Sequence, residues 1–464
     1  MFNKAIYIER RKKLIAHVKT GVILLLGNDE SGMNYKDNCY AFRQDSTFLY
    51  FIGLDQASLV AIIDIDNNTE TLFGNELTVD DIVWNGKEPA MAEQSDKAGI
   101  SIVKPLSAVE WVIKNYISKN RTIHFLPPYR PEHTIKLISW LPIAANALQT
   151  AASVSLIKAV VALRSIKAPE EIIELEKAVD LSVDMHLVAI RSTKAGLTEA
   201  GVAGLVHGVA ISGGGNISFP IILTTNGQIL HNHYTNNLLE QGGMVLCDCG
   251  AETELHYAGD LTRTFPINAS FSTQQKELYN IVLAAHNAAA NALRPQMAFK
   301  DVHLLACQHL VEGLQQLGLM KGDSHAAVEA GAHALFFQCG LGHMLGLDVH
   351  DMENLGEQYV GYDESTQKSM EFGLKSLRLA KPLHQGFVLT VEPGLYFIPE
   401  LIDMWAAEKK HEAFINYNKV EAYKKAGGYR VENDYLITEN GSHTLGKHLP
   451  ITVEEVEAVR RAAL

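Results

Sequence analysis

Short apolar runs separated by turn-forming residues dominate the first third of the chain. Three of them, at 22–26, 59–65 and 122–126, are bounded by glycine, asparagine or proline. Apolar runs of this length with such boundaries are typical of buried strands. A helical pattern over 107–118 lies between the second run and the third. This alternation predicts a small α/β domain at the start of the chain.

The pattern changes near residue 165 to long helical periods followed by strands. Pro169, Glu170 and Glu171 suit the first turn of a helix, whose N–H groups lack partners, and we expect this helix to run towards Arg191. Further helices are predicted over 199–211, 273–293 and 299–317, and strand-rich stretches over 217–225, 244–249, 258–265, 386–397 and 428–438. Helices that precede paired strands, without regular βαβ alternation, indicate an α+β domain. We therefore predict an N-terminal domain over 1–163 and a second domain over 164–464.

The composition agrees with two domains and excludes several classes of partner. A chain of 464 residues with 47% hydrophobic content exceeds what one core usually supports. The formal charge of −13 offers no basic surface for nucleic acid or an anionic membrane. Five scattered cysteines do not resemble a disulfide framework, and the run 22–26 is too short for a signal peptide or a membrane helix. We predict a cytoplasmic protein.

Two aspartates interrupt or follow apolar strands in the second domain. Asp248 lies near the end of the run 244–249, and Asp260 follows twelve residues later. If the chain turns near Glu254, the two strands pair antiparallel and both carboxylates can face one side. Buried carboxylates need a cation or a shared proton, because an unpaired buried charge costs several kcal/mol. A surface hairpin and a catalytic carboxyl pair remain open at this point.

Three further residues strengthen the case for a metal site. His343 lies between glycines, Glu392 interrupts an apolar strand before Pro-Gly, and Glu432 shares a strand face with Arg430. With the two aspartates they form an oxygen-rich set that suits two divalent cations of the manganese, cobalt or zinc kind. Four carboxylates balance two such ions, whereas one ion would leave the cluster anionic. Two ions about 3.5–4 Å apart that share an acidified water form a known hydrolytic arrangement.

Several segments together resemble the pita-bread metallopeptidases, in the proline-specific branch that contains aminopeptidase P and prolidase. They are Phe-Arg-Gln-Asp-Ser at 42–46, Phe-Leu-Tyr at 48–50, Leu-Arg-Ser-Ile-Lys at 163–167 and Asp-Leu-Thr-Arg-Thr-Phe-Pro at 260–266. The resemblance extends over essentially the whole chain. It implies an α+β fold, in which a pita-bread catalytic domain of two related αββ halves follows a smaller α/β domain.

The resemblance also implies roles for particular residues. It maps the metal ligands onto Asp248, Asp260, His343, Glu392 and Glu432. A hydroxide bridging two ions would attack the carbonyl before proline, and Glu392 would carry the proton to the leaving nitrogen. His231 and His350 would hold the substrate and stabilise the oxyanion. Arg430 would orient a ligand carboxylate or the substrate terminus, with a plain salt bridge as the alternative.

Other positions carry weaker predictions. The order Leu-His favours His231 over His233 as the second substrate-binding histidine, although His233 stays a candidate. Trp84 corresponds to a loop tryptophan that can reach the pocket of a neighbouring subunit in this branch and so bind substrate, but we expect a packed indole here. Cys339 departs from the family, which usually has a histidine there and uses it to line the substrate pocket. Cys247 and Cys249 alternate with Asp248, so we expect them to face the core.

The sequence thus predicts a two-metal Xaa-Pro aminopeptidase that acts on proline-containing peptides, with Xaa-Pro dipeptidase as the alternative. Mn²⁺ is the expected metal, with two ions per subunit, and Co²⁺ or Zn²⁺ are alternatives. The resemblance also implies a homodimer or a larger assembly, in which the first domain of one chain approaches the catalytic mouth of another. A non-catalytic pita-bread binding module and a metal-free relative are disfavoured because all five ligands are present. Methionine aminopeptidase is disfavoured by the additional N-terminal domain.

Overall fold

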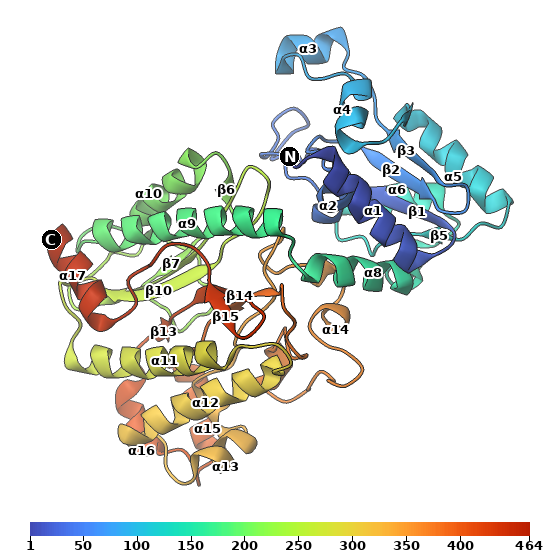
Figure 1. The fold of residues 1–464 in the computed structure, drawn as a ribbon. Coiled ribbons are helices and arrows are strands. Elements are labelled where there is room, and N and C mark those ends of the chain that lie inside the picture. Colours follow the sequence, from blue (N-terminus) through green and yellow to red (C-terminus); the bar gives the residue numbers. More distant parts are fainter. The chain divides into compact units, whose positions relative to one another are not determined.

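The computed structural model describes residues 1–464, drawn as a ribbon in Figure 1. The chain divides into a first unit of residues 1–164 with 354–359, and a second unit of residues 165–353 with 360–464. The division falls near the end of helix α8 (Val154–Ser165), and helix α9 (Pro169–Ser192) begins after a break of three residues. No single helix has the length and apolar character to cross a membrane, although the bent pair 145–151 and 154–165 passes that test together.

The first unit is built on a five-stranded sheet of order β4-β3-β2-β1-β5. Its strands are β1 (Val22–Leu26), β2 (Val60–Asp64), β3 (Thr69–Phe73), β4 (Ile102–Lys104) and β5 (Ile123–His124). The strands β1, β2 and β3 pair antiparallel, whereas β4 and β5 pair parallel with their neighbours. The three predicted strands are confirmed, but β5 is shorter than predicted because the chain reaches the Pro127-Pro128 pair, which has no N–H donors to extend an edge strand.

Helices complete the first unit. They are α1 (Lys4–Val18), α2 (Ser46–Ile52), α3 (Val79–Asn85), α4 (Met91–Ala98), α5 (Val109–Ser118), α6 (Pro131–Trp140), α7 (Leu148–Ala151) and α8. The helix predicted over 107–118 is α5, with a 3-10 turn before it. Helix α3 differs from the others because none of its residues is buried, and Trp84 lies on it.

The second unit has two similar halves. In the first half, α9 and α10 (Glu199–Ser212) precede a sheet of order β10-β8-β7, formed by β7 (Ile222–Thr224), β8 (Met244–Cys249) and β10 (Leu261–Pro266). In the second half, α11 (Thr273–Ala292) and α12 (Phe299–Gln316) precede a sheet of order β11-β14-β15, formed by β11 (Val388–Val391), β14 (Asn433–Ile437) and β15 (Ser442–Thr444). Figure 1 shows the strands between α9 and α10 on one side and α11 and α12 on the other. This confirms the α+β class.

Shorter elements fill the remainder of the second unit. They are β6 (Asn216–Ile217), β9 (Ala251–Glu252), β12 (Gly394–Tyr396), β13 (Gly428–Arg430), α13 (Ser324–Glu329), α15 (Pro399–Ala407), α16 (Tyr417–Val420) and α17 (Val453–Ala463), and α14 (Glu357–Val360) spans the division. The four long helices agree with the predicted ranges to within about one residue. The first turn of α9 carries the expected proline, and the Glu171 carboxylate accepts a hydrogen bond of 3.0 Å from the Ala168 N–H.

The two halves meet where their strands lie side by side. Asp248 in β8 is paired with Thr262 in β10, and Thr262 forms a bridge to Glu432 from the second half. The Glu432 N–H donates to the Thr262 carbonyl at 3.1 Å. The strand predicted over 258–265 begins only at Leu261, because the N–H of Asp260 is bonded to the Asp434 side chain instead of a neighbouring strand. Carboxylates from both halves therefore converge on one seam.

Candidate metal centre

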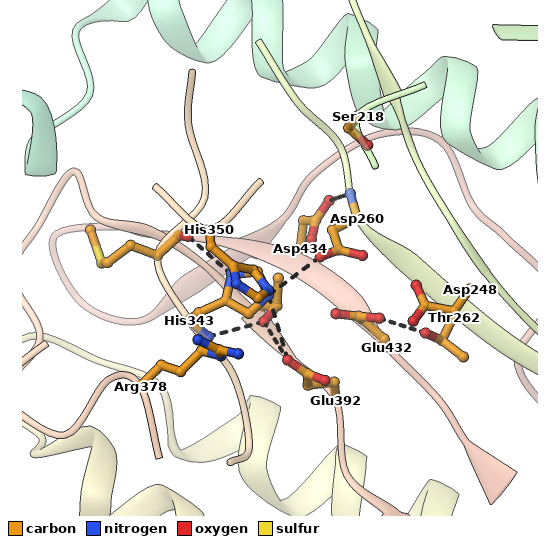
Figure 2. Close-up of polar contacts among 12 residues, drawn as sticks. Ser218, Asp248, Asp260, Thr262, His343, His350, Arg378, Glu392, Glu432 and Asp434 are labelled. Carbon is orange, nitrogen blue, oxygen red and sulfur yellow. Dashed lines mark hydrogen bonds and ion pairs between the residues drawn. The ribbon is translucent and has the colours of Figure 1, made fainter. Parts of the chain in front are cut away.

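A cavity of about 460 Å³ opens over this seam, and all of its lining residues belong to the second unit. The five predicted metal ligands all line it: Asp248, Asp260, His343, Glu392 and Glu432. Figure 2 shows their side chains arranged around a common space. Asp260, His343 and Glu432 are at most 5% exposed, whereas Glu392 is half-buried. The cavity therefore combines a buried acidic floor with an opening for a ligand.

The ligand atoms are close enough to share cations. Nε2 of His343 lies 3.3 Å from Oδ2 of Asp260 and 3.6 Å from Oε1 of Glu392. One ligand atom each from Asp260, His343 and Glu432 lie within 4.8 Å of one another. Divalent cations bind oxygen and nitrogen ligands at about 2.0–2.2 Å, so small inward movements would bring these atoms onto a common ion.

The backbone around His343 fixes which ring nitrogen faces the carboxylates. Nδ1 lies 3.0 Å from the Met344 carbonyl oxygen and is therefore the protonated nitrogen in the neutral ring. The His343 N–H also donates to Oγ1 of Thr390 at 3.1 Å, which joins the His343 loop to β11. Nε2 is left with its lone pair directed at Asp260 and Glu392, as a metal-binding histidine requires.

Neighbouring groups hold the carboxylates in place. Oδ2 of Asp434 accepts from the Asp260 N–H at 3.0 Å, and Oγ1 of Thr262 donates to Oε2 of Glu432 at 2.6 Å. Arg430 donates to Oδ2 of Asp248 at 2.5 Å and to the Tyr396 hydroxyl at 2.9 Å. Arg430 therefore forms an ion pair with a predicted ligand carboxylate, which fits both the orienting role and the plain salt bridge considered for it.

The electrostatics of the cluster call for added positive charge. Burial, and then the charge of Asp248, raises the pKa of Asp260 well above its ordinary value. Burial, and then the charge of Asp260, does the same to the pKa of Glu432. Oδ1 of Asp248 is buried without a hydrogen-bond partner. Four carboxylates, of which Asp248 is paired with Arg430, fit two divalent cations, and the residues present therefore suit the metal centre that the sequence predicts.

Besides His343, three histidines line the cavity: His231, His233 and His350. Nδ1 of His350 lies 3.1 Å from Oε2 of Glu353, and the rings of His343 and His350 are 4.1 Å apart. His231 and His233 both line the cavity, with exposed side chains. Partial burial, and then the positive charge of Arg430, lowers the pKa of His231. The structure thus brings both candidate histidines of the 231–233 segment to the site without separating their roles.

The remaining predicted residues divide into two groups. Cys339 lines the cavity, and burial followed by the charge of Glu392 raises the pKa of its thiol to about 12. Cys247 and Cys249 are fully buried, as predicted for core residues. Trp84 is 84% exposed on α3 of the first unit, so the predicted packed indole is not observed, and Trp84 is not among the residues that line the cavity.

Several contributing residues were not predicted. Thr262 and Asp434 each lie two residues after a predicted ligand, so strand periodicity could have placed them on the same face. Arg378 and Glu353 were not foreseeable in this way. Arg378 lines the cavity and donates to Oε2 of Glu353 at 2.6 Å, but Arg378 lies outside any helix or strand and Glu353 begins a short 3-10 helix, so no periodic signal links them.

Comparisons with known proteins agree with this geometry. Residues 7–124 match the N-terminal domain of aminopeptidase P, and residues 174–439, more than half of the chain, match metallopeptidase family M24. The chain is 29% identical to the Xaa-Pro dipeptidase of Homo sapiens, over 98% of this chain and 92% of the human protein. It is 30% identical to the probable Xaa-Pro aminopeptidase of Sordaria macrospora, over 95% of this chain and 91% of that protein.

The fold comparison extends over the same length. The structure of aminopeptidase P from Escherichia coli with the inhibitor Pro-Leu matches with a TM-score of 0.81 and 27% identity, over 100% of this chain and 99% of that one. These matches confirm the family expected from the sequence motifs. The chain belongs to metallopeptidase family M24, and it carries an N-terminal domain of the aminopeptidase P type.

Proposed function

We propose that the protein is an aminopeptidase that releases the first residue from peptides with proline in second position. One observation carries this proposal: the cavity brings Asp248, Asp260, His343, Glu392 and Glu432 together beneath a wall of histidines. Similarity to aminopeptidase P over the whole chain supports the choice of peptide bond. Two divalent cations, with Mn²⁺ proposed because the donors are mainly carboxylates, would supply charge neutralisation and a water of lowered pKa.

Glu392 is the proposed proton carrier. Its side chain is more exposed than those of Asp260 and His343, and it follows directly after β11, so its carboxylate is open to the cavity. Oε1 of Glu392 accepts a hydrogen bond of 3.4 Å from Oγ1 of Thr390. A carboxylate held in this way can take a proton from the attacking water and give it to the prolyl nitrogen as the peptide bond breaks.

The geometry of His350 refines its proposed role. The hydrogen bond from Nδ1 to Glu353 fixes the tautomer, because the Glu353 carboxylate can only accept. Burial alone would raise the pKa of Glu353, but the hydrogen bond from His350 and the charge of Arg378 outweigh it and bring that pKa down to about 2. Burial, and then the charge of His343, lowers the pKa of His350. Neutral His350 therefore presents an acceptor at Nε2, which suits holding a substrate N–H better than donating to an oxyanion.

Arg430 and the 231–233 segment complete the proposed machinery. Arg430 positions Asp248 and neutralises part of the acidic cluster, and Thr262 and Tyr396 share its other donors. We propose that His231 contacts the substrate, with His233 as the alternative. The five free cysteines suit a reducing compartment, and we propose a cytoplasmic location on that ground.

Xaa-Pro dipeptidase is the second candidate. The similarity to the human Xaa-Pro dipeptidase supports it, and so does a cationic group on the cavity wall. Arg378 presents a guanidinium there, held by Glu353, and a guanidinium is a strong partner for the terminal carboxylate of a dipeptide. A longer peptide would carry that carboxylate further from the scissile bond.

A peptide panel separates the two candidates. The metal-free protein is reconstituted with Mn²⁺, Co²⁺ or Zn²⁺ and tested on Xaa-Pro, Xaa-Pro-Xaa and Xaa-Ala-Xaa. Our proposal predicts cleavage of Xaa-Pro-Xaa and little cleavage of the alanine peptide. Cleavage of dipeptides alone, lost selectively in Arg378→Gln, would establish the second candidate instead. A protein that cleaves none of the three with any metal would be a non-catalytic member of the family.

A further inference from the structure

A second group of metal-binding side chains lies where α12 meets the short helix η3 (Ala332–Leu335). His303 and Cys307 are four residues apart on α12, and His333 lies in η3. All three are at most 3% exposed, and their ligand atoms lie within 4.8 Å of one another. None of the three lines the cavity of the candidate metal centre. The proposed peptidase function therefore leaves this cluster without a role.

The cluster lacks the hydrogen bonds that buried polar groups normally make. Sγ of Cys307 and Nε2 of His303 lie 3.5 Å apart. Nδ1 of His303 and both ring nitrogens of His333 are buried without a hydrogen-bond partner of normal geometry, although the backbone of Val328 lies near the His333 ring. Native proteins rarely leave such groups unsatisfied, because their lost hydration has nothing to replace it. A group that the chain does not provide should therefore contact Nδ1 of His303 and at least one ring nitrogen of His333.

The chemistry of the three side chains favours a cation. Burial, and then the charge of His333, lowers the pKa of His303 to about 3, and burial lowers the pKa of His333 to about 4. Both rings are therefore neutral near pH 7 and have lone pairs to share. A thiol with two imidazoles is a borderline-soft donor set of the kind that Zn²⁺ prefers.

The spacing of the donors agrees with a tetrahedral ion. His303 and Cys307 are separated by one helical turn, which places both side chains on one face of α12. Zinc binds imidazole at about 2.0–2.1 Å and thiolate at about 2.3 Å, so neighbouring ligand atoms around a tetrahedral ion are roughly 3.3–3.8 Å apart. The separation of 3.5 Å between Cys307 and His303 already lies in that range. The ligand atom of His333 lies within 4.8 Å of the other two, and an inward movement of its ring would complete the set.

We propose that His303, Cys307 and His333 bind one Zn²⁺ ion, with a water molecule as the fourth ligand. Binding releases the Cys307 thiol proton to solvent and leaves a thiolate on the metal. Burial, and then the nearby Cys339, raises the pKa of the Cys307 thiol, so the metal competes with a tightly held proton. The site is therefore weaker than a closed four-ligand zinc site and is emptied by moderate acid.

An ion at this position would link α12 to the segment after η3, which continues to the cavity of the candidate metal centre. Directly after η3, the Phe336 carbonyl accepts a hydrogen bond of 2.8 Å from the Tyr396 N–H, and Cys339 and His343 follow on the cavity wall. Zinc bound to His333 therefore holds the start of the segment that carries Cys339 and His343.

A second buried group, formed by His186, Cys247 and Cys249, is a useful contrast. Sγ of Cys249 lies 3.7 and 3.9 Å from the two ring nitrogens of His186, so the sulfur lies beside the ring and not along one lone pair. Both nitrogens also approach backbone carbonyls, at 2.9 and 3.3 Å. The single N–H of neutral His186 therefore has a carbonyl acceptor in either tautomer, and the cysteines of this group provide matched controls.

Cobalt substitution tests the proposal, because a Co²⁺–thiolate bond produces an intense charge-transfer absorption that oxygen and nitrogen ligands do not. The full-length metal-free protein is titrated with Co²⁺, and bound zinc is counted separately after dialysis against Zn²⁺. We expect the charge-transfer band in wild type and in Cys249→Ala and Cys339→Ala. In Cys307→Ala we expect the band to be absent. This variant should also bind one zinc ion per chain fewer than wild type.

A second variant guards against misfolding. His333→Gln keeps the thiol but removes a ligand, so it should weaken the Co²⁺ affinity at least about tenfold while circular dichroism stays unchanged. A wild-type protein without the band would show that the cluster holds only ordered water, and the proposal would be wrong. A band that persists in Cys307→Ala would overturn it equally. Neither result depends on peptide hydrolysis, so this site and the proposed function fail separately.

Discussion

Asp260 and Glu432 show how strongly single residues of the cluster depend on the charge around them. Each is a carboxylate buried beside other carboxylates, and in each case burial and like charge raise the pKa well above its ordinary value. In the metal-free protein, ionisation of either group therefore costs more free energy than it does in the unfolded chain. When a group has a higher pKa in the folded state than in the unfolded state, its contribution to the free energy of unfolding is fully present below the unfolded-state pKa. That contribution is lost as the pH rises through the folded-state pKa.

Asp260→Asn should therefore have opposite effects on activity and on metal-free stability. The variant loses a ligand charge, and we expect kcat/KM for Xaa-Pro-Xaa peptides to fall at least about 10³-fold. In EDTA at pH 7 its melting temperature should exceed that of wild type, because the penalised charge is gone. The difference should shrink as the pH falls towards 4, where Asp260 itself is protonated.

Glu439→Gln provides the control, because Glu439 is exposed and lies outside the cavity. This variant should change neither activity nor metal-free stability. An Asp260→Asn protein that keeps its activity after metal saturation would show that Asp260 is not a ligand.

The thiol of Cys339 gives a second prediction at the residue scale. With a pKa of about 12 it stays protonated near neutral pH, and it is shorter than the imidazole that the family resemblance implies at this position. We expect Cys339→His to raise kcat/KM about tenfold, roughly 1.4 kcal/mol of transition-state stabilisation, and Cys339→Ala to stay near wild type. Loss of activity in both variants would show that the thiol itself acts in the site.

At the scale of elements, periodicity predicted what local sequence determines and missed what tertiary contacts determine. The long helices and strand β8 lie where their patterns placed them, because apolar spacing and first-turn residues are local signals. Strand β10 starts later than predicted because the Asp260 N–H bonds to Asp434, 174 residues away. In the pair of Arg378 with Glu353, one residue lies outside any helix or strand and the other begins a short 3-10 helix, so no sequence period marks the partner.

The segment from 225 to 237, which carries His231 and His233, is held at its base by one buried carboxylate. Glu199, at the first turn of α10, is fully buried and accepts hydrogen bonds from Thr225 N–H at 2.8 Å and Thr235 N–H at 3.0 Å. Burial alone would raise the pKa of Glu199, but these hydrogen bonds outweigh it and lower it. Of the residues between the two contacts only Gly227 is buried, so the position of the segment depends on this attachment.

Glu199→Gln should loosen the His231 segment. A neutral amide cannot accept as many N–H donors, and we expect a loss of about 1–3 kcal/mol in unfolding free energy at pH 7. Because the folded pKa is lowered, this contribution is present above the ordinary pKa of 4.5 and disappears as the pH falls through the folded value. Urea unfolding at a series of pH values measures it, and KM should rise as well.

Glu240→Gln removes an exposed carboxylate just beyond the same segment and should leave both quantities unchanged. An unchanged KM in Glu199→Gln, despite the lower stability, would show that the segment does not hold the substrate.

At the scale of the whole molecule, we predict a homodimer. Helix α3 has no buried residue, and Val79, Val83 and Trp84 are each more than 70% exposed on it. Light scattering should give at least twice the chain mass of 51.1 kDa, because a larger assembly is the alternative. Trp84→Ser should shift the mass towards the monomer, whereas Trp111→Ser, which changes an exposed tryptophan on α5, should not. A fully active wild-type monomer would remove this prediction.

The number of ions that hydrolysis requires tests the central claim most directly. The metal-free protein is titrated with Mn²⁺, which prefers carboxylate oxygens over the thiol-containing cluster of His303, Cys307 and His333. Hydrolysis of an Xaa-Pro-Xaa peptide is followed at each addition. Two ions held by Asp248, Asp260, His343, Glu392 and Glu432 predict that activity rises until two equivalents per chain are bound. Full activity without metal, or a plateau at one equivalent, would contradict the two-metal account.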